Sequence, residues 1–428
     1  MSLEIKASWA SIPPGVNAAE LAATWGTLEL TADGKSITSV EDALSGLSRR
    51  HLDGSLYPLA EWIAFNWWFL SNDSRPADFI LGRPTSASQV NPHWFARHNL
   101  RGAGDGFAWP DLWMVPVGRE ILLRWGSGED NGRVRFIGSG SARVDGDETL
   151  NVLGRFVEQV VERLRSSGLK DTPLQQEWGA IQTAGKDEVE FCRALASLGL
   201  DPYDTDSEYS ELVIHAAQTL SSVDLEVLVT SAAPGRLRGD IDWIGDAESR
   251  LKSSHSDWSR LTKLDQLSGP DPSRSSAEPW RHGYEAAQYV RHSLGVASGQ
   301  PFDFGDLLAY SVVPSSDDGL IALAGAWGES VGVVLGQKRG PNATRFVQAR
   351  AMWRFVTRTE DTTRILIGSG HSQASQMERA FAAELLAPAE AIAERLASGA
   401  SDTEVLAEHF QVSALVVGHQ IENQLSYA

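Results

Sequence analysis

The chain has 428 residues, of which 42% are hydrophobic and 22% are charged, as is ordinary for a globular protein of two or three domains. Its formal net charge of −19 argues against nucleic acid as a partner, because non-specific binding to a phosphate backbone needs a basic surface. The single cysteine, Cys192, excludes an intramolecular disulfide and a multi-cysteine zinc site.

No segment of the sequence predicts targeting or membrane insertion. Residues 1–6 are not a basic region followed by an apolar one, as a signal peptide would require. No run of about 18 apolar residues occurs. We therefore expect a cytoplasmic protein with no membrane partner.

Residues 1–168 predict a tryptophan-rich N-terminal domain of mixed α and β structure. Alternating apolar runs predict strands at 27–31, 112–117 and 120–125. The turn signals are Asp33-Gly34, Val117-Gly118-Arg119 and Asn131-Gly132. An apolar run over 57–70 predicts one buried helix, and apolar spacing over 150–164 predicts an amphipathic helix.

Most aromatic side chains of this domain are expected in its core, and the alternative for some of them is a protein-docking surface. The loop 102–110 is rich in glycine and carries Phe107 and Trp109. Because aromatic anchors are enriched in interfaces, we expect Phe107 and Trp109 to form a contact site for a protein partner.

Residues 169–266 predict a helical middle region. Apolar residues recur at helical spacing over 187–198, 210–220 and 223–231, and Gly199 suits a left-handed helix cap. The polar stretch 267–278 predicts a linker to a last domain at 279–428. That domain combines helical patterns with two strand-like runs. The helices are expected at 283–294, 344–356, 375–386 and from 402 to the end, with a break near Gln411, and the strands at 319–325 and 330–335.

Two blocks in the last domain are specific: Phe-Ala-Ala-Glu-Leu-Leu-Ala-Pro at 381–388 and Phe-Gln-Val-Ser at 410–413. With Arg345-Phe346 opening the helix before them, their order resembles the ImmA/IrrE (DUF955) metallo-endopeptidase family. The resemblance implies a small zincin-like α/β domain. Several members cleave or inactivate helix-turn-helix repressors in bacterial stress, mobile-element or phage-related switches. The whole chain is thus expected to be an α+β multidomain protein.

The zinc motif of that family is altered in this sequence. The family's helix reads Arg-Phe-x-x-Ala-His-Glu-x-x-His, in which two imidazoles one helical turn apart bind the metal and the glutamate acts as general base. In the same frame this chain has Arg350, Ala351 and Arg354. A guanidinium stays protonated at neutral pH and cannot bind zinc, so we predict no metal, no cofactor and no catalytic residue.

The family's third ligand would fall at Met377 or Ser375, and Glu378 lies one residue out of register. Two interpretations of the altered cleft follow. Arg350 and Arg354 lie at i and i+4, so with Glu378 and Glu384 they could bind an anion or a partner. Alternatively, the arginines pair with Glu378 or Glu384 and hold the core together.

These observations predict a non-catalytic, protein-binding or regulatory pseudo-peptidase in a bacterial stress, mobile-element or phage-defence system. The alternative is an altered metallo-endopeptidase that acts on a protein such as a helix-turn-helix repressor. Residues 406–424 have helix-turn-helix character themselves, but 414–425 contain no lysine or arginine. We therefore expect this segment to pack rather than to read DNA.

Overall fold

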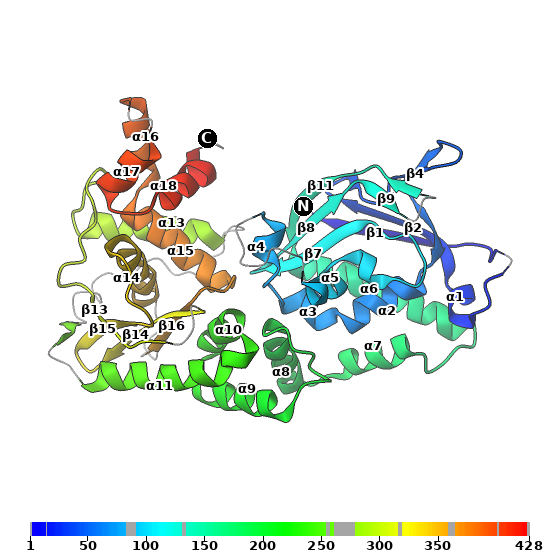
Figure 1. Cartoon of the computed structure of the whole chain (residues 1–428), viewed down its shortest axis with the longest axis horizontal. Helices are drawn as coiled ribbons and strands as arrows, with labels where there is room; N and C mark the ends of the chain where they lie inside the picture. The colour runs from blue at the N-terminus through cyan, green and yellow to red at the C-terminus, as the bar shows by residue number, and fades with distance from the viewer. Residues whose placement is uncertain are drawn as a thin grey trace. The chain divides into compact units, whose positions relative to one another are not determined.

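The computed structural model describes residues 2–13, 15–82, 91–130, 134–253, 257–260, 279–315, 319–357, 364–399 and 402–425. The chain divides into two compact units, Met1–Asp206 and Ser207–Ala428 (Figure 1). Both units combine helices with sheets of mainly antiparallel strands, which confirms the predicted mixed α+β class. None of the helices in these ranges is both long enough and apolar enough to cross a membrane.

Three antiparallel sheets are found in the described part of the N-terminal unit. The first has the order β1-β2-β3, with β6 also paired to β2; the others have the orders β5-β4-β10-β9 and β11-β8-β7. The strands are β1 (Leu3–Trp9), β2 (Trp25–Ala32), β3 (Lys35–Ser36), β4 (Val40–Asp42), β5 (Ser48–Arg49), β6 (Leu52–Ser55), β7 (Asp111–Val117), β8 (Glu120–Gly126), β9 (Gly128–Asp130), β10 (Val134–Phe136) and β11 (Gly140–Asp145). The predicted strands lie within β2, β7 and β8.

The turns between these strands follow the sequence signals. Asp33 and Gly34 join β2 to β3 with φ angles of 51° and 75°, and Gly118, with φ 63°, joins β7 to β8. The third signal, Asn131-Gly132, lies outside the described residues.

Helices cover these sheets and carry most of the core. They are α1 (Ala19–Ala23), α2 (Tyr57–Phe65), α3 (Trp67–Asn72), α4 (Ala77–Ile80), α5 (Pro92–His98), α6 (Gly146–Ser166), α7 (Pro173–Thr183) and α8 (Lys186–Ser197). The amphipathic helix expected at 150–164 is α6, and Asp145 caps its first turn. The single helix predicted at 57–70 is wrong. Asn66 is the C-cap of α2, with φ −106° and ψ 12° outside the helical range, and its side-chain amide donates to the carbonyl of Trp62 at 2.8 Å; α3 starts after it.

Most of the aromatic cluster lies in the core of this unit. Trp62, Trp68, Phe69, Trp109 and Trp113 are all less than 7% exposed. Trp67, Trp94 and Phe107 are partly buried, whereas Phe65 and Phe95 are 49% and 36% exposed. The interpretation of the tryptophans as core residues therefore holds for these positions.

The C-terminal unit is built around one mixed sheet, with β12-β15-β14-β16 in antiparallel order and β13 parallel to β15. The strands are β12 (Ser259–Arg260), β13 (Ala309–Val312), β14 (Leu320–Trp327), β15 (Ser330–Leu335) and β16 (Arg364–Gly368). Successive residues of β15 from Val331 to Leu335 are all buried, so both faces of the sheet are covered. In Figure 1, α14 lies over one face and α11 over the other.

The helices of this unit are α9 (Ser207–Thr219), α10 (Ser222–Ser231), α11 (Leu237–Ser253), α13 (Pro279–Ser293), α14 (Pro341–Val356), α15 (Gln373–Leu386), α16 (Ala389–Ala397), α17 (Thr403–Phe410) and α18 (Ala414–Gln420), followed by a π-helical turn at Ile421–Leu425. The break expected near Gln411 is present, because Gln411 adopts the left-handed conformation at φ 56°. Sequence patterns gave no strand at β16 and no helix at α11.

The boundary between the two units falls inside the predicted middle region 169–266. Its first helices, α7 and α8, belong to the N-terminal unit, and α9, α10 and α11 belong to the C-terminal unit. Gly199 closes α8 with φ 70°, as its position predicted. The proposed linker 267–278 lies outside the described residues.

Candidate functional site

The segment in which the sequence predicted an altered zinc motif lies on α14, which is buried on nearly all sides. Pro341 occupies the first turn of this helix, where its missing N–H costs no hydrogen bond. Two side chains fix the helix against the segment between α13 and β13: Arg345 Nη2 donates to Phe302 O and Gln348 Nε2 donates to Leu308 O, each at 2.6 Å. The helix therefore holds Arg350 and Arg354 in defined positions inside the unit.

Arg350 and Arg354 face the same buried carboxylate. Arg350 is 3% exposed, and its Nη2 donates to Glu378 Oε1 at 2.5 Å and to Gly368 O at 2.7 Å. Arg354 Nε lies 3.6 Å from Glu378 Oε2. Glu378 is 1% exposed and comes from α15. The i, i+4 spacing thus places both guanidinium groups on one helix face, and an acid from the neighbouring helix meets them there.

Of the two interpretations of the arginines, the ion pair is the arrangement present in this structure, and Glu378 is the acid that forms it. Glu384 belongs to a different cluster. Its carboxylate accepts hydrogen bonds from three glutamine side chains and from the first backbone N–H of α16. These donors are Gln288, Gln420, Gln424 and Ala389 N, at 2.8 to 3.2 Å.

The charge cluster around Glu378 is only partly satisfied. Within the described residues, Glu378 Oε2 has no hydrogen-bond partner, and the same holds for Arg350 Nε and for Arg354 Nε and Nη2. Arg354 keeps 16% of its side chain exposed. Buried polar atoms without partners are costly, so this arrangement is not the most stable one that the same space could hold.

The residues at this position do not fit a zinc ion. Ala351 is fully buried and offers a methyl group where the family has a carboxylate. Ser375, at one third-ligand position, donates to the carbonyls of Gly370 and Ser372. Among the residues that the structure describes, no group of three or more His, Cys, Asp or Glu side chains could hold a metal ion.

The edge of the sheet next to this cluster is covered by α10. β16 is the last strand on its side of the sheet and pairs only with β14 in the described ranges. On its free side, Asp224 Oδ1 accepts from Leu366 N at 2.8 Å, and Ser231 Oγ accepts from Gly370 N at 3.0 Å. A helix thus satisfies N–H groups to which an additional strand would otherwise bind. No sequence pattern indicated this contact.

A second buried charge cluster lies in the N-terminal unit. Asp73 accepts from Arg75 Nε and Nη2, both at 2.7 Å, and its Oδ2 lies 3.3 Å from His98 Nε2. His98 Nδ1 lies 3.0 Å from Met114 O. Burial alone would raise the pKa of Asp73, but the hydrogen bonds and charges of Arg75 and His98 lower it to about 2. This cluster is a structural junction between α3, α5 and β7.

The predicted contact loop is packed against its own unit. Trp109 is 4% exposed, and its indole N–H donates to Gly104 O at 3.1 Å. Phe107 is half-buried between Trp25 and Trp109, with ring centroids 6.0 and 6.2 Å away. Trp109 is therefore a core residue in this conformation and cannot serve as an exposed anchor.

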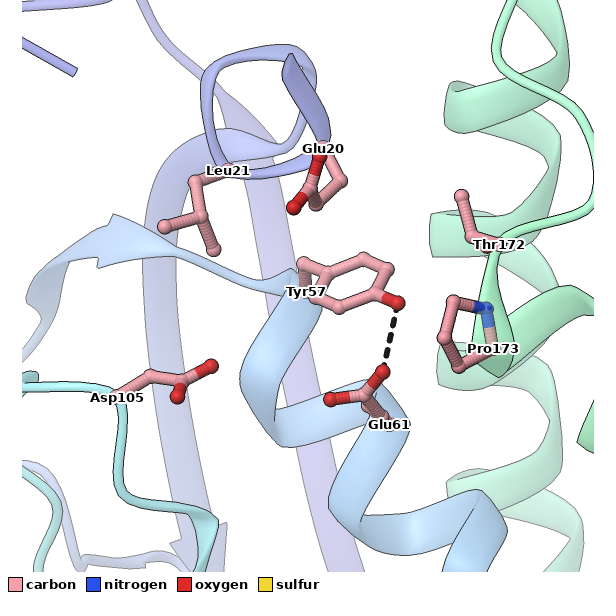
Figure 2. A pocket seen from close by; sticks show the side chains of 7 residues that line it. All are labelled: Glu20, Leu21, Tyr57, Glu61, Asp105, Thr172 and Pro173. Atoms are coloured by element: carbon pink, nitrogen blue, oxygen red, sulfur yellow. Dashed lines mark hydrogen bonds between the residues drawn. The ribbon is translucent and has the colours of Figure 1, made fainter. Parts of the chain in front are cut away.

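An acidic pocket of about 480 Å³ opens in the N-terminal unit. It is lined by Glu20, Leu21, Tyr57, Glu61, Asp105, Thr172 and Pro173 (Figure 2). Tyr57 donates to Glu61 Oε1 at 2.6 Å, and burial together with this carboxylate raises the pKa of the tyrosine well above its usual range. Sequence reasoning missed the pocket because its residues come from separate segments.

Residues 356–422 match the model of the Peptidase_M78 family, described as an IrrE N-terminal-like domain. The C-terminal region of the chain therefore contains an IrrE-like domain, which confirms the resemblance seen in the sequence. Both specific blocks, 381–388 and 410–413, lie inside the match. The match begins at Val356, the last residue of α14, so Arg350, Ala351 and Arg354 lie outside it. Neither curated proteins nor solved structures gave a match to the chain.

Proposed function

We propose that this protein is a non-catalytic relative of the IrrE-like peptidases, with a zincin-like C-terminal domain, that acts by binding another protein. The observation that carries the proposal is the ion-pair cluster of Arg350, Arg354 and Glu378, at the positions where the motif frame would require metal ligands. By analogy with the family, we place its role in bacterial stress, mobile-element or phage-defence regulation.

Coordination chemistry supports this proposal. The guanidinium of Arg350 has no lone pair to give at neutral pH, and the two arginine charges repel a divalent cation. Ala351 has no group that could take a proton from water. Glu378 is the one acid in contact with both arginines among the described residues, and one of its oxygens is already bonded to Arg350.

The position of α10 argues against one mode of partner binding, the addition of a strand at the edge of the sheet. An extended peptide commonly binds a sheet by pairing with a free edge strand. Here the N–H groups of Leu366 and Gly370 on the β16 side already bond to Asp224 and Ser231. We therefore expect the partner to contact the outer surface of the protein and not to add a strand beside β16.

Metal binding by the full chain tests the proposal. The purified protein is incubated with zinc, passed through a desalting column and assayed for bound metal by mass spectrometry. We expect no stoichiometric zinc in the wild type. The matched control is the triple variant R350H/A351E/R354H, which restores two imidazoles and a carboxylate beside Glu378 and is expected to retain zinc.

Capture of a partner from the native host completes the test. We expect the captured protein to be intact, and the folded variant R350A/R354A to capture it as well as the wild type. Loss of capture in that variant would instead establish the anion- or partner-binding role of the arginines. Stoichiometric zinc in the wild type, together with cleavage of the captured protein, would overturn the proposal in favour of an altered metallo-endopeptidase.

A further inference from the structure

The N-terminal strand β1 presents a free edge. In the described part of the chain it pairs with β2 over its full length, from Leu3 opposite Ala32 to Trp9 opposite Gly26, and no strand lies on its other side. An edge of seven residues is long enough to accept another strand.

The hydrogen bonds at the two ends of β1 show which backbone groups point outward. Asp33 N donates to Ser2 O and Ala10 N donates to Trp25 O, each at 3.0 Å. In an antiparallel pair, hydrogen-bonded and non-hydrogen-bonded residues alternate, so the even-numbered residues of β1 bond to β2. The N–H and C=O groups of Leu3, Ile5 and Ala7 therefore face away from β2, along the free edge.

The side chains of β1 also alternate. Leu3 is buried, and Ile5 and Ala7 are partly buried against the core, whereas Glu4 and Lys6 lie on the solvent face. The side chains of Glu4 and Lys6 are 57% and 67% exposed, and their charged groups are 3.6 Å apart. The strand thus carries one negative and one positive charge, placed symmetrically about Ile5.

We infer that β1 is a homodimerisation edge, at which it pairs antiparallel with β1 of a second copy about a two-fold axis at Ile5. In this register Ile5 lies opposite Ile5 of the second copy, and Leu3 lies opposite its Ala7. All these residues have outward-facing backbone groups, so each pair can exchange two hydrogen bonds. Glu4 then lies opposite Lys6 of the second copy, and Lys6 opposite its Glu4.

The charges of Glu4 and Lys6 favour the register with its axis at Ile5 over the registers with an axis at the residue before or after it. Only registers that pair odd-numbered residues with odd-numbered residues can form the hydrogen bonds. An axis at Glu4 would place the two glutamates opposite each other, and an axis at Lys6 would place the two lysines opposite each other. Because each copy contributes the same edge, the contact closes at two chains and joins two four-stranded sheets.

Charge-reversal variants of the full chain test this inference. We expect sedimentation equilibrium to show a monomer–dimer equilibrium in the wild type. E4K and K6E should each weaken dimerisation about tenfold or more, because two attractive cross-strand pairs become two repulsive ones. The matched control is K35E, which reverses an exposed charge on β3 of the same sheet and should leave the equilibrium unchanged.

A mixture of the two variants gives the decisive readout. E4K carries two lysines on this edge and K6E carries two glutamates, so every cross-strand charge pair in their heterodimer is attractive. We expect native mass spectrometry of the mixture to show the heterodimer in preference to either homodimer. A wild type that stays monomeric at about 100 µM would overturn the inference. So would a dimer that E4K and K6E leave unchanged.

Discussion

Each unit buries a carboxylate between two basic side chains, but the hydrogen bonds of the two clusters are completed to different degrees. Both oxygens of Asp73 accept hydrogen bonds from Arg75, which binds in bidentate geometry, and His98 adds a third contact. Glu378 has one short hydrogen bond to Arg350, while its second oxygen and Arg354 Nη2 have no hydrogen-bond partner among the described residues. The first cluster is a complete structural junction. In the second cluster, several buried polar atoms lack a hydrogen-bond partner among the described residues, so its geometry is the less favourable of the two.

Among variants of the two clusters, we expect D73N to cause the largest loss of unfolding free energy. Removing this charge leaves the partly buried Arg75 without its counter-ion and the buried ring of His98 without its carboxylate contact, which costs about 3 kcal/mol of unfolding free energy. Urea denaturation, with hydrogen exchange followed on α3 and α5, measures the loss. The control D53N removes an exposed partner of Arg49 and should cost at most about 0.5 kcal/mol. Equal losses in the two variants would contradict the role given to Asp73.

The matching change in the other unit, E378Q, is expected to cost about 2 kcal/mol. The loss is smaller because one carboxylate oxygen already lacks a hydrogen bond, and Arg354 can turn toward water. Urea denaturation with hydrogen exchange on α14 and α15 gives the value. A loss larger than that of D73N would show that the Glu378 cluster is the better-satisfied one.

The contribution of Asp73 to the unfolding free energy is expected to depend on pH. Its pKa is about 2 in the folded protein against 3.8 as the ordinary value, so its stabilisation is present above pH 3.8 and is lost as the pH falls through 2. The expected contribution is about 2 kcal/mol. The difference in unfolding free energy between the wild type and D73N should therefore shrink between pH 5 and pH 2. A difference that stays constant over this range would contradict the lowered pKa.

The smallest effect is expected when the ion pair of the second cluster is replaced as a whole. In R350M/E378M, two buried charges give way to apolar side chains of similar length, and such exchanges are often neutral or stabilising. The double variant should lose less than about 1 kcal/mol and be more stable than E378Q. Thermal unfolding compares the two proteins. A double variant less stable than E378Q would mean that the pair stabilises the fold.

The sequence predicted part of the Glu378 cluster and none of the Asp73 cluster. The spacing of Arg350 and Arg354 predicted that both lie on one helix face, and both do contact Glu378. The sequence did not predict which acid would form the ion pair with the two arginines, because the register of α15 depends on the cap at Ser372 and on tertiary packing. In the N-terminal unit, no sequence pattern indicated that His98 would be completely buried against Asp73.

The sequence predicted those elements whose hydrophobic periodicity continues over many consecutive residues or whose turn residues are characteristic. α6, α14 and the β7–β8 hairpin follow from periodicity and turn residues. The break at Asn66 was not predicted, since a change of backbone angles at one residue leaves the apolar period of the sequence unchanged. The short strand β16 was not predicted either, because five residues between a polar stretch and a helix carry little signal of their own.

The contact of α10 with β16 has a kinetic consequence. An amide hydrogen at the border of a sheet ordinarily exchanges with solvent quickly, because water reaches it directly. At Leu366 and Gly370 the proton acceptors are a carboxylate and a hydroxyl from a packed helix, and Leu366 is fully buried. Deuterium should therefore enter these two positions only when α10 separates from the strand, so their exchange rates report the opening of that helix.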